Sequence, residues 1–183
     1  MQITSSRQAA PNQDLILRAQ QGESESIAWL FERFQPGIFR YLYYRLGDRQ
    51  TAEDLTSEVF VRMLRSLSGY KTQGASFQGW LFRIARNLAV DYFRQSGSNA
   101  ELSEDMQTAE QSPEAALEQS LTHDELRKAL TRLSSEQSDV IILRFVLGLH
   151  IAQVAQVLGK SEDAIKGLQR RSLLALREVL SNW

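Results

Sequence analysis

The chain has 183 residues, 43% of them hydrophobic, and its 21 lysines and arginines nearly balance its 22 aspartates and glutamates. It has no cysteine and only two histidines, which excludes a disulfide framework and a cysteine-based metal site. No stretch approaches the length of a membrane span, and the N-terminus lacks the apolar core of a signal peptide. We therefore expect a cytoplasmic protein without membrane insertion.

The net charge of −1 conceals an uneven distribution along the chain. Residues 1–95 carry 12 cationic and 9 acidic side chains, whereas residues 96–122 carry no cation and 6 acids. Residues 123–183 carry 9 cations and 7 acids. Two mildly basic blocks therefore flank an acidic connector, and the local charges say more about partners than the total does.

The first block shows helical periodicity from its beginning. The segment NQDLILRAQQG predicts a helix capped by Asn12 and ended by Gly22. A second helix is expected from Ser24, with its apolar residues at helical intervals. Pro36 should kink or interrupt this helix, because proline removes a backbone donor and clashes with the preceding turn.

Two further helices complete the first block. Asp48 is the predicted N-cap of RQTAEDLTSEVFVRMLRSL, whose apolar stripe consists of Leu55, Val59, Met63 and Leu67. Ser76 is the predicted start of FQGWLFRIARNLAVDYFRQ. No alternating strand pattern competes with these helices.

The structure of the connector and of the second block is also predicted from composition and from helix-start residues. Residues 96–112 contain serine, glycine, amides and acids with almost nothing to bury, which predicts a flexible acidic linker. Pro113 begins a further predicted helix, and Ser134 begins a capping box. A last pair of helices is expected over residues 151–158 and 162–180. The sequence predicts an all-α protein of two small helical domains that move independently.

The last two helices have the form of a helix-turn-helix, with Gly159-Lys160-Ser161 as the tight turn. The apolar side of the second helix consists of Ile165, Leu168, Ser172 and Leu176. Its opposite side carries Lys166, Gly167 and Arg170, with Arg171 at the edge. Glycine inside a helix costs about 1 kcal/mol relative to alanine, and close approach of a sugar-phosphate backbone is one reason to tolerate it. An ordinary solvated face is the alternative.

Two other segments carry candidate binding residues. The helix expected after Ser76 mixes aromatic rings with Arg83, Arg86 and Asn87, a mixture that suits single-stranded nucleic acid. Trp80 in the same helix is expected in the core, because large aromatic side chains are mostly buried.

Earlier in the chain, Asp54 and Glu58 share one helix face, with Glu53 nearby. A ferritin-type metal site would require Glu-x-x-His partners, and residues 1–122 contain no histidine. The spacing leaves two alternatives, a solvated face and a surface for a basic partner.

These three segments together resemble those of the extracytoplasmic-function, or group four, sigma factors of bacterial RNA polymerase. AEDLTSEVFVRML resembles the helix that binds core polymerase, and FQGWLFRIARNLAVDYFR resembles the segment that opens and reads the −10 element. The C-terminal segment that begins with LSSEQSDVIILRF is similar to the −35-binding domain. The resemblance implies sigma region 2 at residues 1–95, a linker at 96–112 and sigma region 4 at 113–183.

The resemblance also implies a role for each candidate residue. The side chains facing the clamp coiled coil of the largest polymerase subunit would be Glu53, Asp54 and Glu58. The −10 site would consist of Tyr70, Arg83, Arg86 and Asn87. The −35 contacts would come from Lys166, Gly167, Arg170 and Arg171.

The expected partners are core RNA polymerase, through its clamp coiled coil and flap, promoter DNA and an anti-sigma factor. No catalytic residue, metal or cofactor is expected, since the sequence has no phosphate loop or nucleophile elbow. This chain departs from the family pattern at Gln153, where a glutamate is usual, and at Leu168-Gln169, where many members have arginine and leucine. The alternative function is a helical adaptor whose basic helix binds protein.

Overall fold

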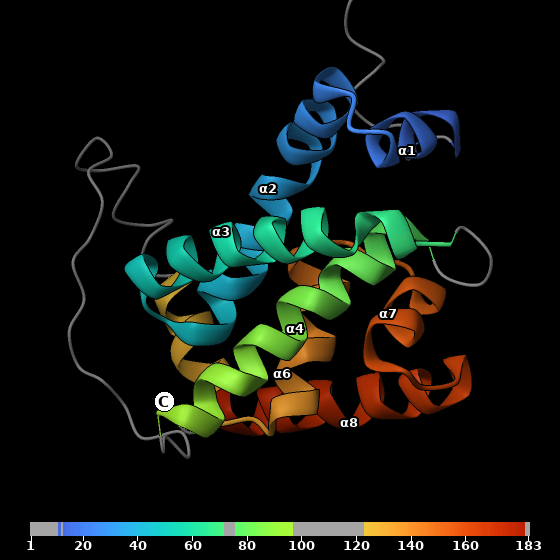
Figure 1. Cartoon of the computed structure of the whole chain (residues 1–183). Coiled ribbons are helices and arrows are strands. Elements are labelled where there is room, and N and C mark those ends of the chain that lie inside the picture. The colour runs from blue at the N-terminus through green and yellow to red at the C-terminus, as the bar shows by residue number, and fades with distance from the viewer. Residues whose placement is uncertain (1–10, 12, 72–75, 97–122, 182–183) are drawn as a thin grey trace, which may run out of the picture.

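The computed structural model of the chain describes residues 11, 13–71, 76–96 and 123–181, and every regular element within them is helical (Figure 1). The predicted all-α class is therefore confirmed. The predicted Asn12 cap, the helix start at Pro113 and all of the predicted linker except its first residue lie outside the described residues.

The elements in chain order are α1 (Gln13–Gln20), α2 (Ser24–Leu46), α3 (Arg49–Ser66), the 3₁₀ turn η1 (Leu67–Gly69), α4 (Phe77–Gln95), a helix over residues 123–131, α6 (Ser135–Ile141), the π-helical turn η2 (Ile142–Val146), α7 (Ile151–Leu158) and α8 (Glu162–Ser181). We call α1 to α4 the first helical unit, and residues 123–131 with α6 to α8 the second helical unit.

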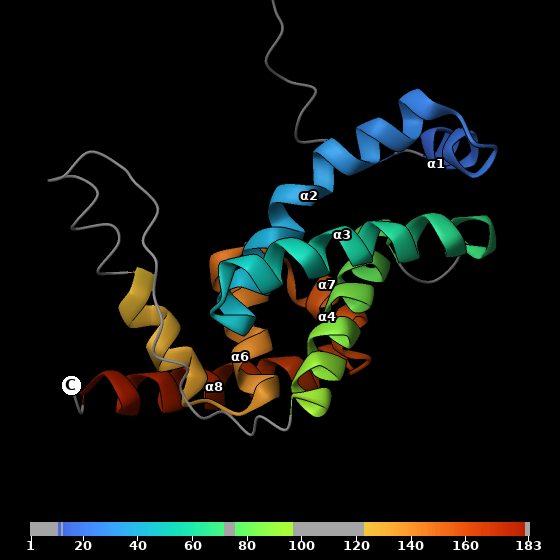
Figure 2. The same ribbon diagram turned by 60° about the vertical axis from the view of Figure 1, so that its left-hand side comes forward.

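The first helical unit is built on α2, α3 and α4, which pack against one another around apolar side chains. Its fully buried members include Leu30, Ile38, Leu42, Val59 and Leu81. Each such side chain contributes about 1.5–3 kcal/mol relative to an exposed position. α1 packs on the beginning of α2, at the far end of the molecule from α8 (Figures 1 and 2).

The proline in α2 does not interrupt the helix, contrary to one of the two outcomes expected from the sequence. α2 runs through Pro36 from Ser24 to Leu46, with the proline on its exposed side. Phe34 and Ile38 are buried on either side of it. Tertiary packing of these neighbours therefore offsets the lost backbone hydrogen bond.

The predicted helix boundaries of the first unit have their expected chemistry. The Asp48 carboxylate accepts a hydrogen bond from the Thr51 N–H at 2.6 Å, and the Ser76 hydroxyl accepts one from the Gly79 N–H at 3.1 Å. Each side-chain oxygen satisfies a backbone donor that has no partner within its helix. Gly47 ends α2 in the left-handed conformation, with φ of 80°. The caps at α3 and α4 are confirmed.

The second helical unit packs α6 and α7 against α8, and η2 against α6 and α7. Ser134 forms the predicted capping box, in which Gln137 Oε1 accepts from the Ser134 N–H at 3.0 Å. Buried side chains in its core include Leu130, Ile141, Leu143, Val154 and Ile165. α8 extends along the edge of the molecule farthest from α1 (Figures 1 and 2).

The tight turn between α7 and α8 is also as predicted. Gly159 adopts the left-handed conformation with φ of 65°, and the Lys160 N–H donates to the Ala155 carbonyl at 3.0 Å. The Ser161 hydroxyl accepts from the Ala164 N–H at 3.2 Å, which caps α8. These local bonds fix the direction in which α8 leaves the turn.

The two helical units lie against each other, which differs from the expectation of independently moving domains. α4 packs beside α7, and η2 contacts α2 (Figures 1 and 2). The buried apolar side chains of both units form one contiguous cluster. The sequence pattern shows which helix faces each unit buries internally. It does not show that the two units also bury surface against each other.

Replacing Asp48 by alanine should lower the free energy of unfolding by about 1 kcal/mol, because the Thr51 N–H loses its acceptor. Urea denaturation at pH 7 measures this change. Asp48→Asn keeps a cap oxygen and should remain within about 0.5 kcal/mol of the parent. If the asparagine variant is destabilised as much as the alanine variant, the cap is not the cause.

Acid should reduce the difference in the free energy of unfolding between the parent and Asp48→Ala. Hydrogen bonds from Thr51 hold the pKa of Asp48 below its ordinary value. The charge-dependent part of the cap therefore stabilises the fold fully above the unfolded-state pKa and is lost as the pH falls through the lowered folded-state pKa. Because the protonated carboxyl keeps a neutral cap oxygen, the difference in stability between the parent and Asp48→Ala should fall across this acidic range toward the difference between Asp48→Asn and Asp48→Ala.

Candidate polymerase and nucleic-acid interfaces

The acidic face of α3 is exposed and carries the three acids that the sequence singled out. Each acid interacts with a side chain one helical turn away. The pairs are Arg49 with Glu53 at 2.9 Å, Gln50 with Asp54 at 3.1 Å and Arg62 with Glu58 at 2.9 Å. Exposed pairs of this kind contribute about 0–1 kcal/mol, so a partner can replace them at little cost.

An exposed apolar ridge that the sequence analysis did not identify lies beside these acids. Val61 and Leu64 follow Glu58 on α3, and each exposes more than a third of its surface. Phe31 of α2 is also exposed, and its ring centroid lies 4.6 Å from that of Phe60. The sequence pattern indicates this exposure, because Val61 and Leu64 fall outside the predicted apolar stripe of α3.

Tyr70 is held in an aromatic cluster at the beginning of α4. Its ring centroid lies 4.9 Å from Trp80 and 5.4 Å from Phe77. The Gln20 side-chain amide donates to the carbonyls of Tyr70 and Leu67, both at 2.8 Å. Burial raises the pKa of Tyr70, so its hydroxyl remains protonated at neutral pH. Trp80 packs against the core, as expected, while remaining partly accessible.

The other three candidates for the −10 site project from α4 in different environments. Asn87 is exposed. Arg83 donates from Nη2 to the Gln156 carbonyl of α7. Arg86 Nε donates to Asp139 Oδ2 of α6 at 2.9 Å. The structure thus brings Arg83 and Arg86 together at the contact between the two helical units, and it does not bring Tyr70 or Asn87 into that contact.

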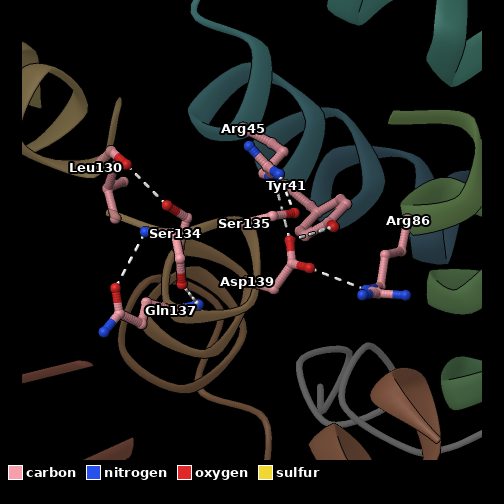
Figure 3. A network of polar contacts seen from close by, with 9 residues as sticks. Tyr41, Arg45, Arg86, Leu130, Ser134, Ser135, Gln137 and Asp139 are labelled. Carbon is pink, nitrogen blue, oxygen red and sulfur yellow. Dashed lines mark hydrogen bonds and ion pairs between the residues drawn. The ribbon is translucent and has the colours of Figure 1, made fainter. Parts of the chain in front are cut away.

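Asp139 is the functional candidate that the sequence analysis missed. Its carboxylate is fully buried and accepts hydrogen bonds from Tyr41 Oη at 2.9 Å, Arg45 Nε at 3.1 Å and Arg86 Nε at 2.9 Å (Figure 3). Burial, followed by the Asp139 charge, holds the pKa of Tyr41 well above its ordinary value, so Tyr41 remains a donor. We call these four residues the Asp139 network.

The sequence contains one signal for the Asp139 network. Asp139 directly precedes the apolar run VIIL. On a solvated helix, the acids would instead lie on the outer face, away from the apolar residues. A buried carboxylate needs charged or hydrogen-bonding partners. Nothing in the linear pattern indicates that those partners come from α2 and α4, roughly fifty to a hundred positions earlier.

A second contact between the units lies at the start of α4. Gln156 Oε1 accepts from the Ser76 N–H at 3.1 Å and the Ser76 hydroxyl at 3.0 Å. Gln153 Nε2 donates to Gln78 Oε1 at 2.8 Å. A Cβ at Gly79 would lie 2.7 Å from Gln156 Oε1, a distance that real Cβ atoms essentially never show. This close approach therefore requires the glycine or a shift of the Gln156 side chain.

A third contact ties the helix over residues 123–131 to the end of α2. Arg127 is buried, and its Nη1 donates to Tyr43 Oη at 2.8 Å and to the Gly47 carbonyl at 3.1 Å. Its Nη2 donates to Asp124 Oδ1 at 2.6 Å. The contact between the units is therefore polar at three separate places.

The basic face of α8 has the sidedness that the sequence predicts. Ile165, Leu168 and Ser172 are buried, whereas Lys166, Arg170 and Arg171 are exposed. These residues stand on the helix that directly follows the Gly159 turn. The exposed face is thus directed away from the second unit's core and is free to meet a partner.

Three details describe the chemistry of this face. Lys166 Nζ lies 2.9 Å from Asp163 Oδ1, and this hydrogen bond raises the pKa of Lys166. A Cβ at Gly167 would make only an ordinary contact, 3.6 Å from Arg171 Nη1. Nothing described within the chain therefore requires glycine at position 167. In addition, Gln169 Oε1 accepts a hydrogen bond from Arg144 Nε at 3.0 Å.

The metal and membrane expectations can be compared with the described part of the chain. Within it, no group of three or more histidines and acids is arranged to hold a metal ion. The helices of that same part include none with the length and apolar character of a membrane span.

Comparison with known proteins gives matches over both helical units. Residues 30–99 match the Sigma-70 region 2 family, and residues 123–176 match the Sigma-70, region 4 family. The chain is 41% identical over 171 residues to the ECF RNA polymerase sigma factor BldN of Streptomyces coelicolor, covering 91% of this chain and 65% of that protein. It is 30% identical over 162 residues to the ECF RNA polymerase sigma factor SigX of Bacillus subtilis, covering 84% and 83% of the two chains.

A solved structure shares the fold. The sigma factor RpoE, in its complex with the anti-sigma factor NepR from Bartonella quintana, matches with a TM-score of 0.69 and 23% identity, covering 86% of this chain and 98% of that one. The two family matches occur in the same order as the α3–α4 surfaces and the helix-turn-helix. The chain therefore belongs to the extracytoplasmic-function (ECF) sigma factors, the transcription initiation factors of bacterial RNA polymerase.

Proposed function

We propose that the chain binds core RNA polymerase through α3, reads a −35 element with α8, and reads and helps to open a −10 element with α4 and Tyr70. The observation that carries the proposal is the exposed basic face of α8 behind a well-formed helix-turn-helix turn. A scaffold that binds only protein is not favoured, because sigma regions 2 and 4 both match.

The −35 role rests on charge and shape together. Lys166, Arg170 and Arg171 supply three exposed cations within two turns of one helix. Gly167 lies among them, and because glycine has no side chain, a DNA backbone can approach the helix closely there. A base contact gives about 1–3 kcal/mol of discrimination, whereas a phosphate contact gives mainly salt-dependent affinity. The two roles can therefore be separated by experiment.

Arg170→Ala or Lys166→Ala should remove the preference of the holoenzyme for its cognate −35 sequence over a scrambled one. Arg171→Ala should weaken both sequences alike and lower the salt slope by about 0.9. Binding to the two duplexes across a salt series measures both effects. Arg177→Ala, an exposed cation two turns further along α8, is the matched control and should change neither. Unchanged affinity, slope and preference in all three test variants would contradict the −35 role.

The −10 role rests on Tyr70 and Asn87. The ring of Tyr70 is fixed by Phe77 and Trp80, and the Asn87 amide is exposed on α4. An extruded base needs stacking and a hydrogen-bonding edge to offset an unstacking cost of about a few kcal/mol. A fixed aromatic ring and an accessible amide supply these two kinds of contact.

Tyr70→Ala and Asn87→Ala should allow closed promoter complexes and impair open ones, since each removes a contact made only after a base leaves the stack. Permanganate probing of the −10 region by the holoenzyme measures strand opening. Tyr92→Ala removes an exposed aromatic ring of α4 and should open the promoter normally. Normal opening by both test variants would mean that the site lies elsewhere.

The polymerase role rests on the acids of α3 and the apolar ridge beside them. A basic partner can replace the weak pairs made by Glu53, Asp54 and Glu58, and the exposed Val61 and Leu64 add area that becomes buried on contact. We infer that this combined surface faces the clamp coiled coil of the largest polymerase subunit, while the second unit faces the flap.

The variant Asp54→Lys/Glu58→Lys should bind core polymerase at least tenfold more weakly, because each change replaces attraction by repulsion. Exposed substitutions usually alter stability by no more than about 0.5 kcal/mol, so the variant should fold. Asp14→Lys/Glu25→Lys makes the same charge change at exposed positions of α1 and α2 and is the matched control. Equal affinity of the folded test and control variants would contradict this role.

Two further elements complete the proposal. The RpoE structure contains an anti-sigma factor, and we infer that a protein of this class also binds the present chain. We infer that the chain acts in the cytoplasm, where RNA polymerase and promoter DNA are located. It acts by binding alone, without a catalytic residue or cofactor.

A further inference from the structure

Gln20, the last residue of α1, connects that helix to the turn that leads into Tyr70. Its side-chain Nε2 donates to the Leu67 carbonyl and to the Tyr70 carbonyl, each at 2.8 Å. A glutamine side chain has two N–H groups on this nitrogen, so these two bonds use both of them. Leu67 begins η1 and Tyr70 directly follows it. Gln20 therefore holds the backbone at both ends of η1.

The two carbonyls lie where the chain leaves α3 and η1. The last carbonyls of a helix have no partner within the helix and need a donor from elsewhere. The Tyr70 N–H donates to the Leu67 carbonyl at 3.1 Å, which closes the turn, and Gln20 supplies the donors from outside it. Gln20 therefore helps to set the direction in which the backbone passes through Tyr70.

The backbone of Gln20 is itself fixed by the turn that ends α1. Gly22 has a φ of 86°, its N–H donates to the Ala19 carbonyl at 3.0 Å, and the Glu23 N–H donates to the Arg18 carbonyl at 3.1 Å. This pair of bonds is a Schellman motif, which satisfies carbonyls at the end of the helix. Ala19 is buried, and α1 packs on α2. Gln20 thus donates from a well-anchored position.

The ring of Tyr70 is held from a different element than its backbone. Phe77 and Trp80, which pack against the ring, both belong to α4, whereas the backbone bonds come from α1. A group that is already ordered before binding does not lose that conformational freedom when its ligand arrives. The two sets of contacts together therefore favour stacking of an incoming base on Tyr70.

We propose that Gln20 is a positioning residue for promoter opening, and that its two hydrogen bonds hold Tyr70 where an extruded −10 base stacks on it. The inference rests on the −10 role proposed above for Tyr70. Gln20 acts through the backbone of Tyr70 and does not bind the base. Loss of its donors should therefore leave the closed complex unchanged, since that complex forms before a base leaves the stack, and should slow strand opening.

Gln20→Met keeps a side chain of similar length and removes both donors. Holoenzyme with this variant should open the −10 region at least about fivefold more slowly than the parent, because the turn loses two hydrogen bonds. The time course of permanganate reactivity measures opening, and promoter binding at low temperature measures the closed complex, whose affinity should not change. Gln21→Met makes the same chemical change at the exposed next position and should open normally. Opening by Gln20→Met at the parent rate would overturn the inference.

Two further variants separate positioning from a general loss of stability. Ile16→Val removes a methyl group from the buried face of α1 and leaves the two hydrogen bonds in place, so it should open the promoter normally. Gln20→Lys supplies donors again, because an ammonium group has three N–H groups and no acceptor, and it should recover most of the parent rate. Slow opening by Ile16→Val, or opening by Gln20→Lys as slow as by Gln20→Met, would show that the hydrogen bonds are not the cause.

A double variant tests whether Gln20 acts through Tyr70. Effects of independent residues multiply in a rate, whereas residues that act through one contact are not additive in free energy. Gln20→Met should therefore slow opening little further in the Tyr70→Ala background. A further loss as large as the one in the parent background would overturn the positioning role.

The proposed function and the positioning role fail in different ways. If Tyr70→Ala opens the promoter at the parent rate, the −10 role of Tyr70 fails and the positioning role fails with it. If Tyr70→Ala opens slowly and Gln20→Met opens at the parent rate, only the positioning role of Gln20 fails.

Discussion

The buried carboxylate of Asp139 is the interaction on which the arrangement of the two helical units depends. It accepts hydrogen bonds from Tyr41, Arg45 and Arg86, which come from α2 and α4 of the other unit. A carboxylate in an apolar setting is unfavourable unless such partners neutralise and hydrogen-bond it. The contact is therefore specific in geometry, while the desolvation of its charged groups keeps its net strength low.

The local features of the fold were predictable because their causes lie within a few residues. Asp48, Ser76 and Ser134 cap helices through oxygens that reach backbone donors three positions away. Gly159 ends α7 because its positive φ is accessible to glycine. The exposed side of α8 follows from the spacing of Ile165 and its apolar neighbours. Sequence periodicity therefore predicts the helices, the turn and the basic face.

The remaining features depend on contacts between distant residues, which periodicity does not encode. Arg86 was predicted as part of a −10 site, and the sequence could not reveal that Asp139 also binds it. Of the two effects expected of Pro36, an interruption of α2 does not occur, because the neighbouring residues of that helix are buried. The spacing of Val61 and Leu64 already places them outside the predicted apolar stripe of α3, and the packing of that helix confirms that they remain exposed.

The central claim is that Arg45 and Arg86 share the Asp139 carboxylate in the free protein. Nuclear magnetic resonance of the arginine side-chain Nε–H groups tests it directly, because an Nε–H bound to a buried acceptor exchanges slowly with water. We predict that the free chain at neutral pH shows slowly exchanging Nε–H signals for both arginines, and that Asp139→Asn removes them while leaving the Arg62 signal unchanged. Exchange at Arg45 and Arg86 as fast as at the exposed Arg94 would contradict the account.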